Sequence, residues 1–402
     1  MKVKILLVWG VGLPHRYHPS FTRPYYLIRH YSTAAQITLV SPYIGKIEFS
    51  DDVDVKLVDL PRFRSRLSKE LYRIAGRLSL ENFRYSRDFN FARLYYPDFQ
   101  REVSRILRIQ DYDVVYADFI STPYLLHYIK SREHRPVVLE FFSPQLYAFR
   151  NFASSGYITY LLGYISLKLF EVRRYRLFDG GVYVSQTHLE LSKPYTPKRC
   201  FVIPPGVDTE YFQPFEKEED SDPTILFMGT MSYPPNVSAV LWFYRRVYPL
   251  VKKEVPRVKF YIVGRAPDKE ILKLSSDKSV VVTGGVEDVR VYLAKASVFV
   301  NPIILDDGGI KTKVLEAMAS AKAIVSTPLG VRDLGVENEK HVMIAANEKD
   351  FADKIINLLR DEGERHRLGR EARKFAEENY SWEKISRKLY DVLNTFAISS
   401  TH

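Results

Sequence analysis

The chain has 402 residues, a formal net charge of +11 at pH 7 and a single cysteine, Cys200. A chain of this length has room for two or three domains with separate cores, and one cysteine excludes a disulfide framework and suits a reducing compartment. No run of apolar residues reaches the roughly 20 that a membrane-spanning helix needs, so the sequence predicts a globular protein without such a helix.

Strand-like apolar runs alternate with helical patterns along the chain, in two series. The first run, residues 5–13 behind Lys2 and Lys4, superficially suggests a signal peptide but lacks a small-residue cleavage site, so we interpret it as a strand. Runs that are apolar on both faces and separated by helices favour parallel sheets with helical crossovers. The predicted strands are 4–9, 36–40, 113–117, 137–141, 181–185 and 200–203 in the first series, and 224–228, 259–263, 280–283, 297–301, 323–326 and 341–344 in the second.

A charged stretch with several prolines, residues 204–223, separates the two series and is typical of a linker. The sequence therefore predicts two α/β domains over residues 1–205 and 206–380, each built on a doubly wound, Rossmann-like sheet. Sheets of this kind bind ligands at the carboxyl ends of their strands, so we expect the site in a cleft between two facing domains.

The strongest functional signal lies at residues 301–319, where an apolar strand ends in two carboxylates and two glycines and an amphipathic helix follows. On that helix, Lys313 and Glu316 are one turn apart on the polar side. Glycines and the amides of a helix start attract phosphates, and a carboxylate accepts hydrogen bonds from hydroxyls. This pattern indicates a nucleotide-sugar pocket, with a solvated Lys–Glu pair as the alternative. The predicted apolar stripe is Ile310, Val314, Ala317, Met318 and Ala321.

The same segment, with 323–330 after it, resembles the donor-site signature of GT4-type retaining glycosyltransferases, which have the GT-B fold. Further matching segments, in the family's order, are 203–208, 227–236, 261–267, 283–290 and 380–382. The resemblance covers nearly all of residues 200–390 and is looser before them. It implies an acceptor-binding first domain, a donor-binding second domain, and a final helix (382–402) that packs back on the first domain.

The resemblance also implies roles on the donor side. Glu316 matches the second glutamate of the family's Glu-x7-Glu pattern, which accepts hydrogen bonds from the ribose hydroxyls. The first glutamate is absent, because position 308 is Gly308; Asp306 and Asp307 either substitute for it or cap the helix. The loop Gly308, Gly309, Ile310 and Lys311 then lies at the donor, with Lys313 and Lys311 facing the diphosphate.

A second departure follows strand 224–228, where many relatives carry an Arg and a Lys that neutralise the departing diphosphate. Gly229 begins this loop, but no basic residue accompanies it. The compensating charge is then expected from Lys313, from the helix start, or from Arg265, for which a plain surface position is the alternative. Val286 occupies the place where relatives hold the base through backbone atoms, which leaves a UDP-sugar or a GDP-sugar equally open.

In the first domain, Gly12 ends a Gly-x-Gly that family members bring up to the donor phosphates, although a strand-to-helix turn explains it as well. Arg23 is expected at the edge of the cleft, facing a phosphate of the acceptor. Glu140 stands where relatives often have a histidine facing the sugar, so it either contacts the sugar or caps a helix. The resemblance implies no metal and no cofactor apart from the nucleotide-sugar substrate.

Residues 62–108 carry twelve Lys and Arg against five Asp and Glu, interleaved with aromatic residues. Such a segment suits an anionic membrane surface or a polyanionic acceptor, and the alternative is a solvated helical surface. No nucleic-acid-binding motif accompanies the charge, so nucleic acid is not an expected partner. We expect a cytoplasmic enzyme that is peripheral on the inner face of the cell membrane.

The sequence hypothesis is a metal-independent retaining glycosyltransferase that moves a sugar from a nucleotide-sugar to a lipid-linked or polysaccharide acceptor. The residues expected to carry the chemistry are Lys313, Glu316, Glu140 and Asp307. Two alternatives belong to other classes: a nucleotide-sugar 2-epimerase, and a non-catalytic polyanion-binding protein on a degenerate GT-B fold.

Overall fold

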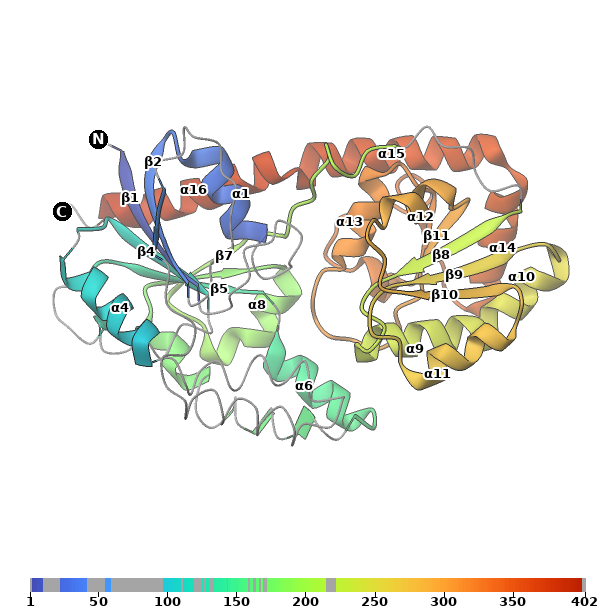
Figure 1. Cartoon of the computed structure of the whole chain (residues 1–402), viewed down its shortest axis with the longest axis horizontal. Helices are drawn as coiled ribbons and strands as arrows, with labels where there is room; N and C mark the ends of the chain where they lie inside the picture. Colours follow the sequence, from blue (N-terminus) through green and yellow to red (C-terminus); the bar gives the residue numbers. More distant parts are fainter. Residues whose placement is uncertain are drawn as a thin grey trace. The chain divides into compact units, whose positions relative to one another are not determined.

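The computed structural model describes residues 2–9, 22–41, 55–58, 97–109, 111–118, 134–157 without 143, 172–214 and 222–399, together with single residues between 125 and 168. The chain divides into two compact units, Met1–Pro204 with Ile385–His402, and Pro205–Lys384 (Figure 1). Each unit has its own parallel sheet and its own hydrophobic core.

Seven parallel strands form the described sheet of the first unit, in the order β3-β2-β1-β4-β5-β6-β7. Residues 5–8 of β1 are fully buried, as expected for a strand covered on both faces. The strands are β1 Val3–Val8, β2 Ala35–Val40, β3 Val55–Val58, β4 Val114–Asp118, β5 Val137–Phe141, β6 Gly180–Tyr183 and β7 Arg199–Val202.

Helices lie on both faces of this sheet. Helix α4 buries Val103 and Ile106 in the core on one face, whereas Phe396 of α16 lies against Gly180 of β6 on the other. Helix α16 begins at Trp382 and belongs to the first unit from Ile385 onward. The described helices are α1 Thr22–Tyr31, α4 Pro97–Ile109, α6 Gln145–Ser154, α8 Gln186–Ser192 and α16 Trp382–Ser399, with 3-10 turns η3 Val172–Leu177 and η4 Lys193–Tyr195.

The second unit has a six-stranded parallel sheet in the order β10-β9-β8-β11-β12-β13. Its central strands are apolar on both faces and buried, which again requires helices above and below. The strands are β8 Thr224–Met228, β9 Lys259–Val263, β10 Val280–Gly284, β11 Val298–Asn301, β12 Ile324–Ser326 and β13 Met343–Ile344.

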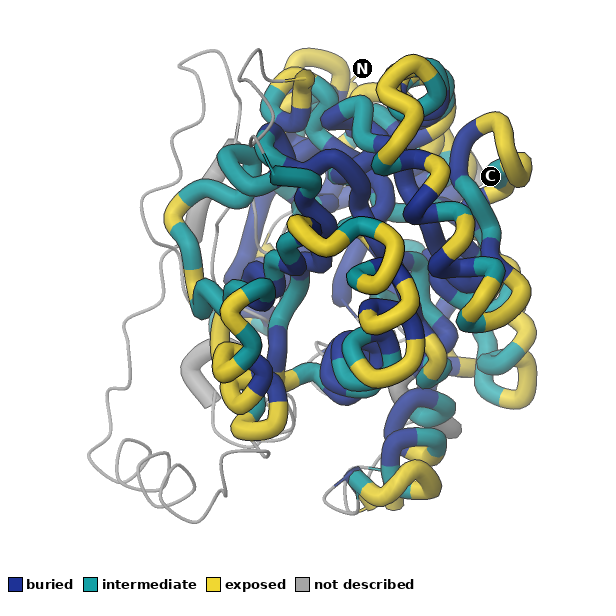
Figure 2. Tube along the Cα trace, turned by 90° about the vertical axis from the view of Figure 1, so that its right-hand side faces the viewer, coloured by how far each residue is buried: buried dark blue, intermediate teal, exposed yellow. Residues whose placement is uncertain are grey.

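Two separate cores cover the two faces of this second sheet. Side chains of α9, α10, α11 and α14 fill the core on one face, and those of α12, α13 and α15 fill the other. Figure 2 shows the buried strands inside and the exposed positions along the outward turns of the helices. Among the described residues, no helix is both long enough and apolar enough to cross a membrane. The helices are α9 Pro234–Trp242, α10 Tyr248–Glu254, α11 Lys269–Leu272, α12 Arg290–Lys295, α13 Thr312–Ala319, α14 Glu348–Arg360 and α15 Glu362–Tyr380, with turns η5 Phe243–Val247, η6 Lys273–Ser276 and η7 Pro328–Val331.

The predicted strands are all present, with ends that differ by at most two residues, and both sheets are parallel as expected. The sequence reading missed β3, a four-residue edge strand. It also began the functional helix too early, because α13 starts at Thr312 and Lys311 before it is extended. The helix ends at Ala319, and Ala321 beyond it has a left-handed backbone. The buried stripe is therefore shorter than predicted, from Val314 to Met318.

The ends of β8 and β9 pack against each other through backbone alone. A Cβ atom at Gly264 would lie 1.7 Å from the carbonyl oxygen of Gly229, and Gly264 has a φ of 152° that other residues rarely adopt. At Gly285, which follows the end of β10, the atom nearest to an added Cβ would be 3.6 Å away.

We therefore expect Gly264→Ala to lower the free energy of unfolding by about 2 kcal/mol or more, because the methyl group has no room and the backbone is strained. Gly285→Ala, the matched control, should cost less than about 1 kcal/mol. Denaturant unfolding of both variants measures the difference. Equal costs for the two variants would contradict the packing described for Gly264.

Candidate functional site

Three neighbouring strands of the second sheet end at glycines, which leaves their carboxyl edge without side chains. These residues are Gly229 after β8, Gly264 after β9 and Gly284 at the end of β10. Backbone hydrogen bonds join them, from Gly229 N–H to Val263 O at 3.0 Å and from Gly264 N–H to Gly284 O at 3.0 Å. The carboxyl edge of a parallel sheet is where α/β folds bind ligands, and glycines let a ligand approach the backbone.

Lys313, in the first turn of α13, lies against this glycine edge. Its ammonium donates to Asn236 Oδ1 at 2.5 Å and lies 4.2 Å from the centre of the Phe227 ring. A Cβ at Gly229 would come within 3.1 Å of the same nitrogen. The side-chain amide of Asn236 in turn donates to Thr230 O at 2.8 Å. Lys313 is thus held in one place by neutral groups, and no carboxylate among the described residues is in hydrogen-bond contact with it.

Burial shifts the pKa of both charged residues on α13, Lys313 and Glu316, toward 7. It lowers the pKa of Lys313 to about 7, and the nearby charge of Lys311 adds to this effect. It raises the pKa of Glu316 to about 7, against the opposing pull of Lys313. Both side chains keep some surface. Within the described residues the Glu316 carboxylate has no hydrogen-bond partner, so it is available to a donor from a ligand.

The loop before α13 is held together by its own charges. Lys311 donates to Asp307 Oδ1 and to Gly309 O, the latter at 2.6 Å, while Tyr233 donates to Asp307 Oδ2 at 2.8 Å. Both charged residues are 8% exposed. The Lys311 ammonium is thus paired with Asp307, and its predicted contact with a diphosphate stays a prediction. Asp307 also does not cap α13, which has no side-chain cap.

The other carboxylate of this loop, Asp306, is paired as well. It accepts from Gly308 N–H at 2.7 Å and from both terminal nitrogens of Arg332 at 2.6 and 2.7 Å. Gly308 itself has a left-handed φ of 72°, a conformation that glycine adopts without cost. The position of the missing family glutamate is therefore part of a tight turn that directly follows two ion-paired aspartates.

Arg265 and Val286 lie beside the glycine edge. Arg265 follows Gly264, is exposed, and makes no side-chain hydrogen bond or ion pair within the described residues. Val286 follows Gly285 and packs partly buried against the core under α13. Arg265 is therefore placed to add a cation at the strand ends, whereas Val286 offers only its backbone.

In the first unit, Arg23 and Glu140 form a buried ion pair, and the contacts predicted for them with an acceptor phosphate and a sugar stay predictions. Arg23 Nε lies 2.9 Å from Glu140 Oε1, and the two residues are 4% and 0% exposed. Arg23 also donates to the carbonyls of Ile203 and Pro204, and Tyr116 donates to Glu140. Burial raises the pKa of Glu140, opposed by Arg23 and Tyr116. The pair ties α1 to β5 and to the end of the first unit, instead of presenting free charges to a phosphate or sugar.

Some expectations lie outside the described residues. Gly12 and its loop lie outside the described part, and so do residues 62–96 of the basic segment. Among the described residues, no group of three His, Cys, Asp or Glu side chains is placed to hold a metal ion.

The sequence reading assigned no role to Asn236, Tyr233 or Arg332, which hold Lys313, Asp307 and Asp306 respectively. A signal for two of them was available, because Tyr233 and Asn236 flank two prolines at the start of α9. Proline at a helix start fixes the first turn, so residues beside it are well placed to hold a ligand-binding side chain.

The second unit resembles a known protein family. The family model described as Glycosyl transferases group 1 matches residues 222–361. A protein of Klebsiella pneumoniae named Uncharacterized 44.6 kDa protein in cps region is 26% identical over 44% of this chain and 47% of its own length. The GDP-mannose-dependent alpha-(1-6)-phosphatidylinositol monomannoside mannosyltransferase of Mycobacterium tuberculosis is 24% identical over 54% of this chain and 63% of its own. The chain thus spans about half the length of the curated relatives that it matches.

A solved structure shows the fold. HepE of Anabaena, in complex with UDP and glucose, superposes with a TM-score of 0.63 over 98% of this chain and 99% of its own, at 14% identity. An identity this low shows the fold alone. With the two parallel α/β sheets, it confirms the predicted GT-B fold.

The position of Glu316 makes protein stability depend on pH. Because burial raises its pKa from 4.5 to about 7, the folded protein binds this proton more tightly than the unfolded chain does. The resulting stabilisation is complete below about pH 4.5 and is lost as pH rises through about 7. Glu316→Gln removes this dependence, so the variant should gain roughly 1–3 kcal/mol in free energy of unfolding, relative to the parent, between about pH 5 and about pH 8.

Denaturant unfolding of parent and variant at the two pH values measures this gain. The matched control is Glu378→Gln, which changes an exposed glutamate on α15 and should show no such difference. A parent–variant difference that is constant with pH would mean that Glu316 is ordinarily solvated.

Proposed function

We propose that the chain, whose residues 222–361 match the family model described as Glycosyl transferases group 1, is a retaining glycosyltransferase that uses a nucleotide-sugar donor. The observation that carries this proposal is the Lys313 ammonium beside Gly229 at the end of β8, with Glu316 one turn further along α13. Lys313 offers a cation, and Glu316 offers a carboxylate without a hydrogen-bond partner among the described residues. A nucleoside diphosphate needs these two groups, for its phosphates and its ribose hydroxyls respectively.

The donor diphosphate lies against Lys313, with Arg265 as a second cation. Glu316 accepts from the ribose, and the backbone at Val286 holds the base. The low pKa of Lys313 supports this arrangement, since a diphosphate beside it would raise the pKa and restore the charge. The relative from Mycobacterium tuberculosis is named for GDP-mannose and the Anabaena structure for UDP, so we propose a UDP- or GDP-sugar.

In the reaction, the bond between the sugar's anomeric carbon and the diphosphate breaks, and a bond from that carbon to an acceptor oxygen forms on the same face. The acceptor proton passes to an oxygen of the leaving diphosphate. The protein supplies position and charge, because negative charge grows on the diphosphate as the bond breaks. No protein nucleophile and no metal ion are needed in this scheme.

The acceptor we propose is a glycan or a lipid-linked sugar at the cytosolic face of a membrane. The net charge of +11 favours an anionic surface or acceptor. The names of two relatives, one from a cps region and one specifying a phosphatidylinositol mannoside, agree with this class.

A screen of nucleoside diphosphates by thermal shift tests the donor assignment. We expect UDP or GDP to raise the melting temperature of the parent, and the increase to fall in Glu316→Gln, because a hydrogen bond to a charged carboxylate contributes about 1.5–3 kcal/mol. No stabilisation by any nucleotide would favour the polyanion-binding alternative. Release of a 2-epimerised sugar from donor incubated without acceptor would favour the epimerase.

A variant of Lys313 distinguishes an effect on donor binding from an effect on the transition state. Lys313→Ala should lower turnover by about 10²–10³ while raising the donor's Michaelis constant much less, since its charge matters most as the diphosphate leaves. Donor hydrolysis provides the assay until an acceptor is known. The comparison variant is Lys311→Met with Asp307→Asn, which removes an ion pair without leaving a buried charge alone.

We expect this double variant to lose less turnover than Lys313→Ala. A larger loss in the double variant would move the catalytic role to Asp307. Parental turnover in Lys313→Ala would instead make Arg265 the cation that stabilises the leaving group.

A further inference from the structure

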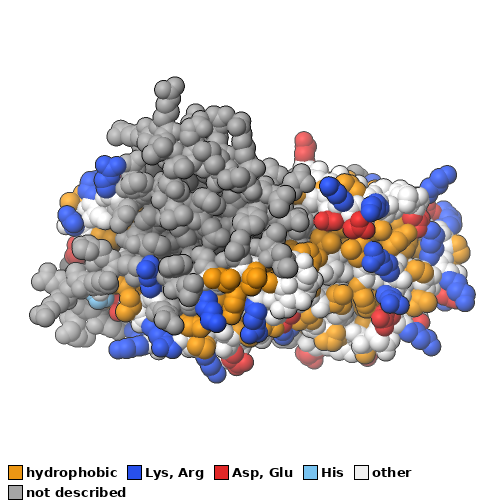
Figure 3. Space-filling view, turned by 90° about the horizontal axis from the view of Figure 1, so that it is seen from below, with side chains coloured by type: hydrophobic (Ala, Val, Ile, Leu, Met, Phe, Trp, Pro, Cys, Tyr) orange, Lys and Arg blue, Asp and Glu red, His pale blue; other side chains and the backbone are white. Residues whose placement is uncertain are grey.

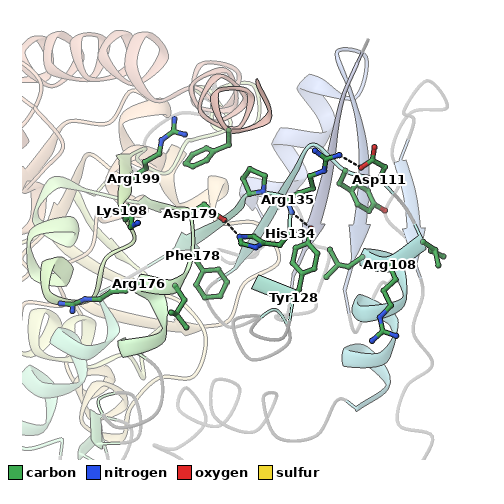
Figure 4. A pocket seen from close by; sticks show the side chains of 16 residues that line it. Arg108, Asp111, Tyr128, His134, Arg135, Arg176, Phe178, Asp179, Lys198 and Arg199 are labelled. Carbon is green, nitrogen blue, oxygen red and sulfur yellow. Dashed lines mark hydrogen bonds and ion pairs between the residues drawn. The ribbon is translucent and has the colours of Figure 1, made fainter. Parts of the chain in front are cut away.

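A cavity of about 1240 Å³ opens at the amino edge of the first sheet, the edge opposite Glu140. Its walls include residues just before four strands: Asp111 before β4, Pro136 before β5, Asp179 before β6 and Lys198 before β7. The end of α4 and Phe396 of α16 complete it (Figure 4). The cavity therefore lies wholly within the first unit and shares no residue with the site around Lys313.

The side chains that line the cavity carry more positive charges than negative ones. Arg135 pairs with Asp111 at 3.1 Å, and His134 lies 3.5 Å from Asp179. These are the two carboxylates of the lining. Within the described residues the remaining cations have no carboxylate partner, and they are Arg108, Arg176, Lys198 and Arg199.

Two of these cations are held in place by neutral groups. Arg199 lies 3.9 Å from the centre of the Phe396 ring and donates to Thr395 at 3.1 Å. Arg176 donates to the carbonyl of Pro194. A guanidinium that is already positioned loses less conformational entropy when it binds an anion, and its planar fork suits phosphate.

The cavity also has an apolar component beside the charges. Phe178 and Phe396 are buried in its wall, whereas Leu177 and Ile109 are 53% and 60% exposed next to Arg176 and Arg108. A second, smaller hollow adjoins it along α4 and shares Ile109 and Arg108. Exposed aliphatic side chains alternating with cations match a ligand that is both anionic and apolar.

Basic residues alone would not single out this place, because Lys and Arg side chains are spread among apolar ones over the face drawn in Figure 3. The cavity differs in combining a hollow, uncompensated cations and exposed aliphatic side chains. In Figure 4, Arg176, Lys198 and Arg199 are on one side and Arg108 on the other, with the paired His134 and Asp179 between them.

We propose that this cavity binds the phosphate-bearing head of an anionic amphiphile, with the phosphate on the basic rim and an adjoining aliphatic part against Leu177 and Ile109. A lipid within a bilayer and a single dispersed amphiphile share this chemistry. The site is separate from the donor site and does not depend on the transferase proposal.

Dihexanoyl phosphatidylglycerol, a soluble short-chain lipid, is the first probe. Zwitterionic dihexanoyl phosphatidylcholine, which has no net charge, is its comparison. The full chain should bind the anionic probe more tightly. Arg108→Gln with Lys198→Gln should weaken that binding by about tenfold or more, since charged hydrogen bonds to phosphate are lost. Neither side chain has a partner within the described residues, so the fold should be retained, as a melting curve verifies.

The matched control is Arg246→Gln with Lys253→Gln, which removes the same two charges from exposed positions on η5 and α10. A second variant, Ile109→Ser with Leu177→Ser, should weaken binding of both probes, whereas Leu250→Ser with Leu272→Ser, also exposed, should not. The proposal is overturned if the charge variant binds the anionic probe as its control does, or if the aliphatic variant binds both probes like the parent.

Sedimentation with phosphatidylcholine vesicles, with and without phosphatidylglycerol, distinguishes a lipid within a bilayer from a single dispersed amphiphile. Binding to anionic vesicles that is lost in the charge variant identifies a bilayer lipid as the ligand. Binding of the short-chain probe without binding to vesicles identifies a single amphiphile. Both results support the site, and the vesicle arm is read at low salt because surface charges are screened over about 8–10 Å at higher salt.

Discussion

The contact between the backbones of Gly264 and Gly229 sets the geometry of the second unit's functional edge. Any side chain at Gly264 would separate β8 from β9, because the Gly229 carbonyl fills the space where its Cβ would be. The close approach leaves the strand ends flat and bare. Lys313 can then rest on Phe227 and reach Asn236, and a ligand can reach the backbone beside it. The cation and the binding surface therefore come from the same packing constraint.

Buried charges in this protein fall into two kinds, and the difference bears on function. Arg23 with Glu140, and Lys311 with Asp307, are paired internally, as burial of a charge requires. Within the described part of the chain, neither Lys313 nor Glu316 has an oppositely charged hydrogen-bond partner, and burial moves both pKa values toward 7. A protein tolerates this cost where a ligand removes it, which is why perturbed groups gather at functional sites. Lys313 and Glu316 are for that reason better candidates for ligand contact than the internally paired Asp307, Lys311, Arg23 and Glu140.

The sequence was sufficient for the architecture because buried parallel strands are continuous apolar runs, which local pattern detects. It failed at β3, whose four residues lie at an edge between aspartates, and at the start of α13, where Ile310 fits the helical stripe although Lys311 is extended. It placed Lys313 and Glu316 correctly on one helix. It could not foresee that Arg23 meets Glu140, since the two come from distant parts of the chain and only the assembled sheet brings them together. The position of a residue in a sequence motif does not predict which charged residue it pairs with in the folded protein.

The two edges of the first sheet differ in charge balance. The charged side chains at the carboxyl edge are paired with each other, whereas those at the amino edge leave an excess of positive charge. At the carboxyl edge, Glu140 receives Arg23 and Tyr116 within the core, so its charge is balanced before any ligand arrives. At the amino edge, Asp111 pairs with Arg135 and Asp179 lies 3.5 Å from His134, and the lining holds five Lys and Arg side chains against these two carboxylates. Solvent can screen that excess, but it cannot cover Leu177 and Ile109 without the cost of wetting apolar surface. A single ligand that supplies both negative charge and aliphatic surface relieves both costs together, whereas a purely ionic ligand would leave the aliphatic side chains exposed.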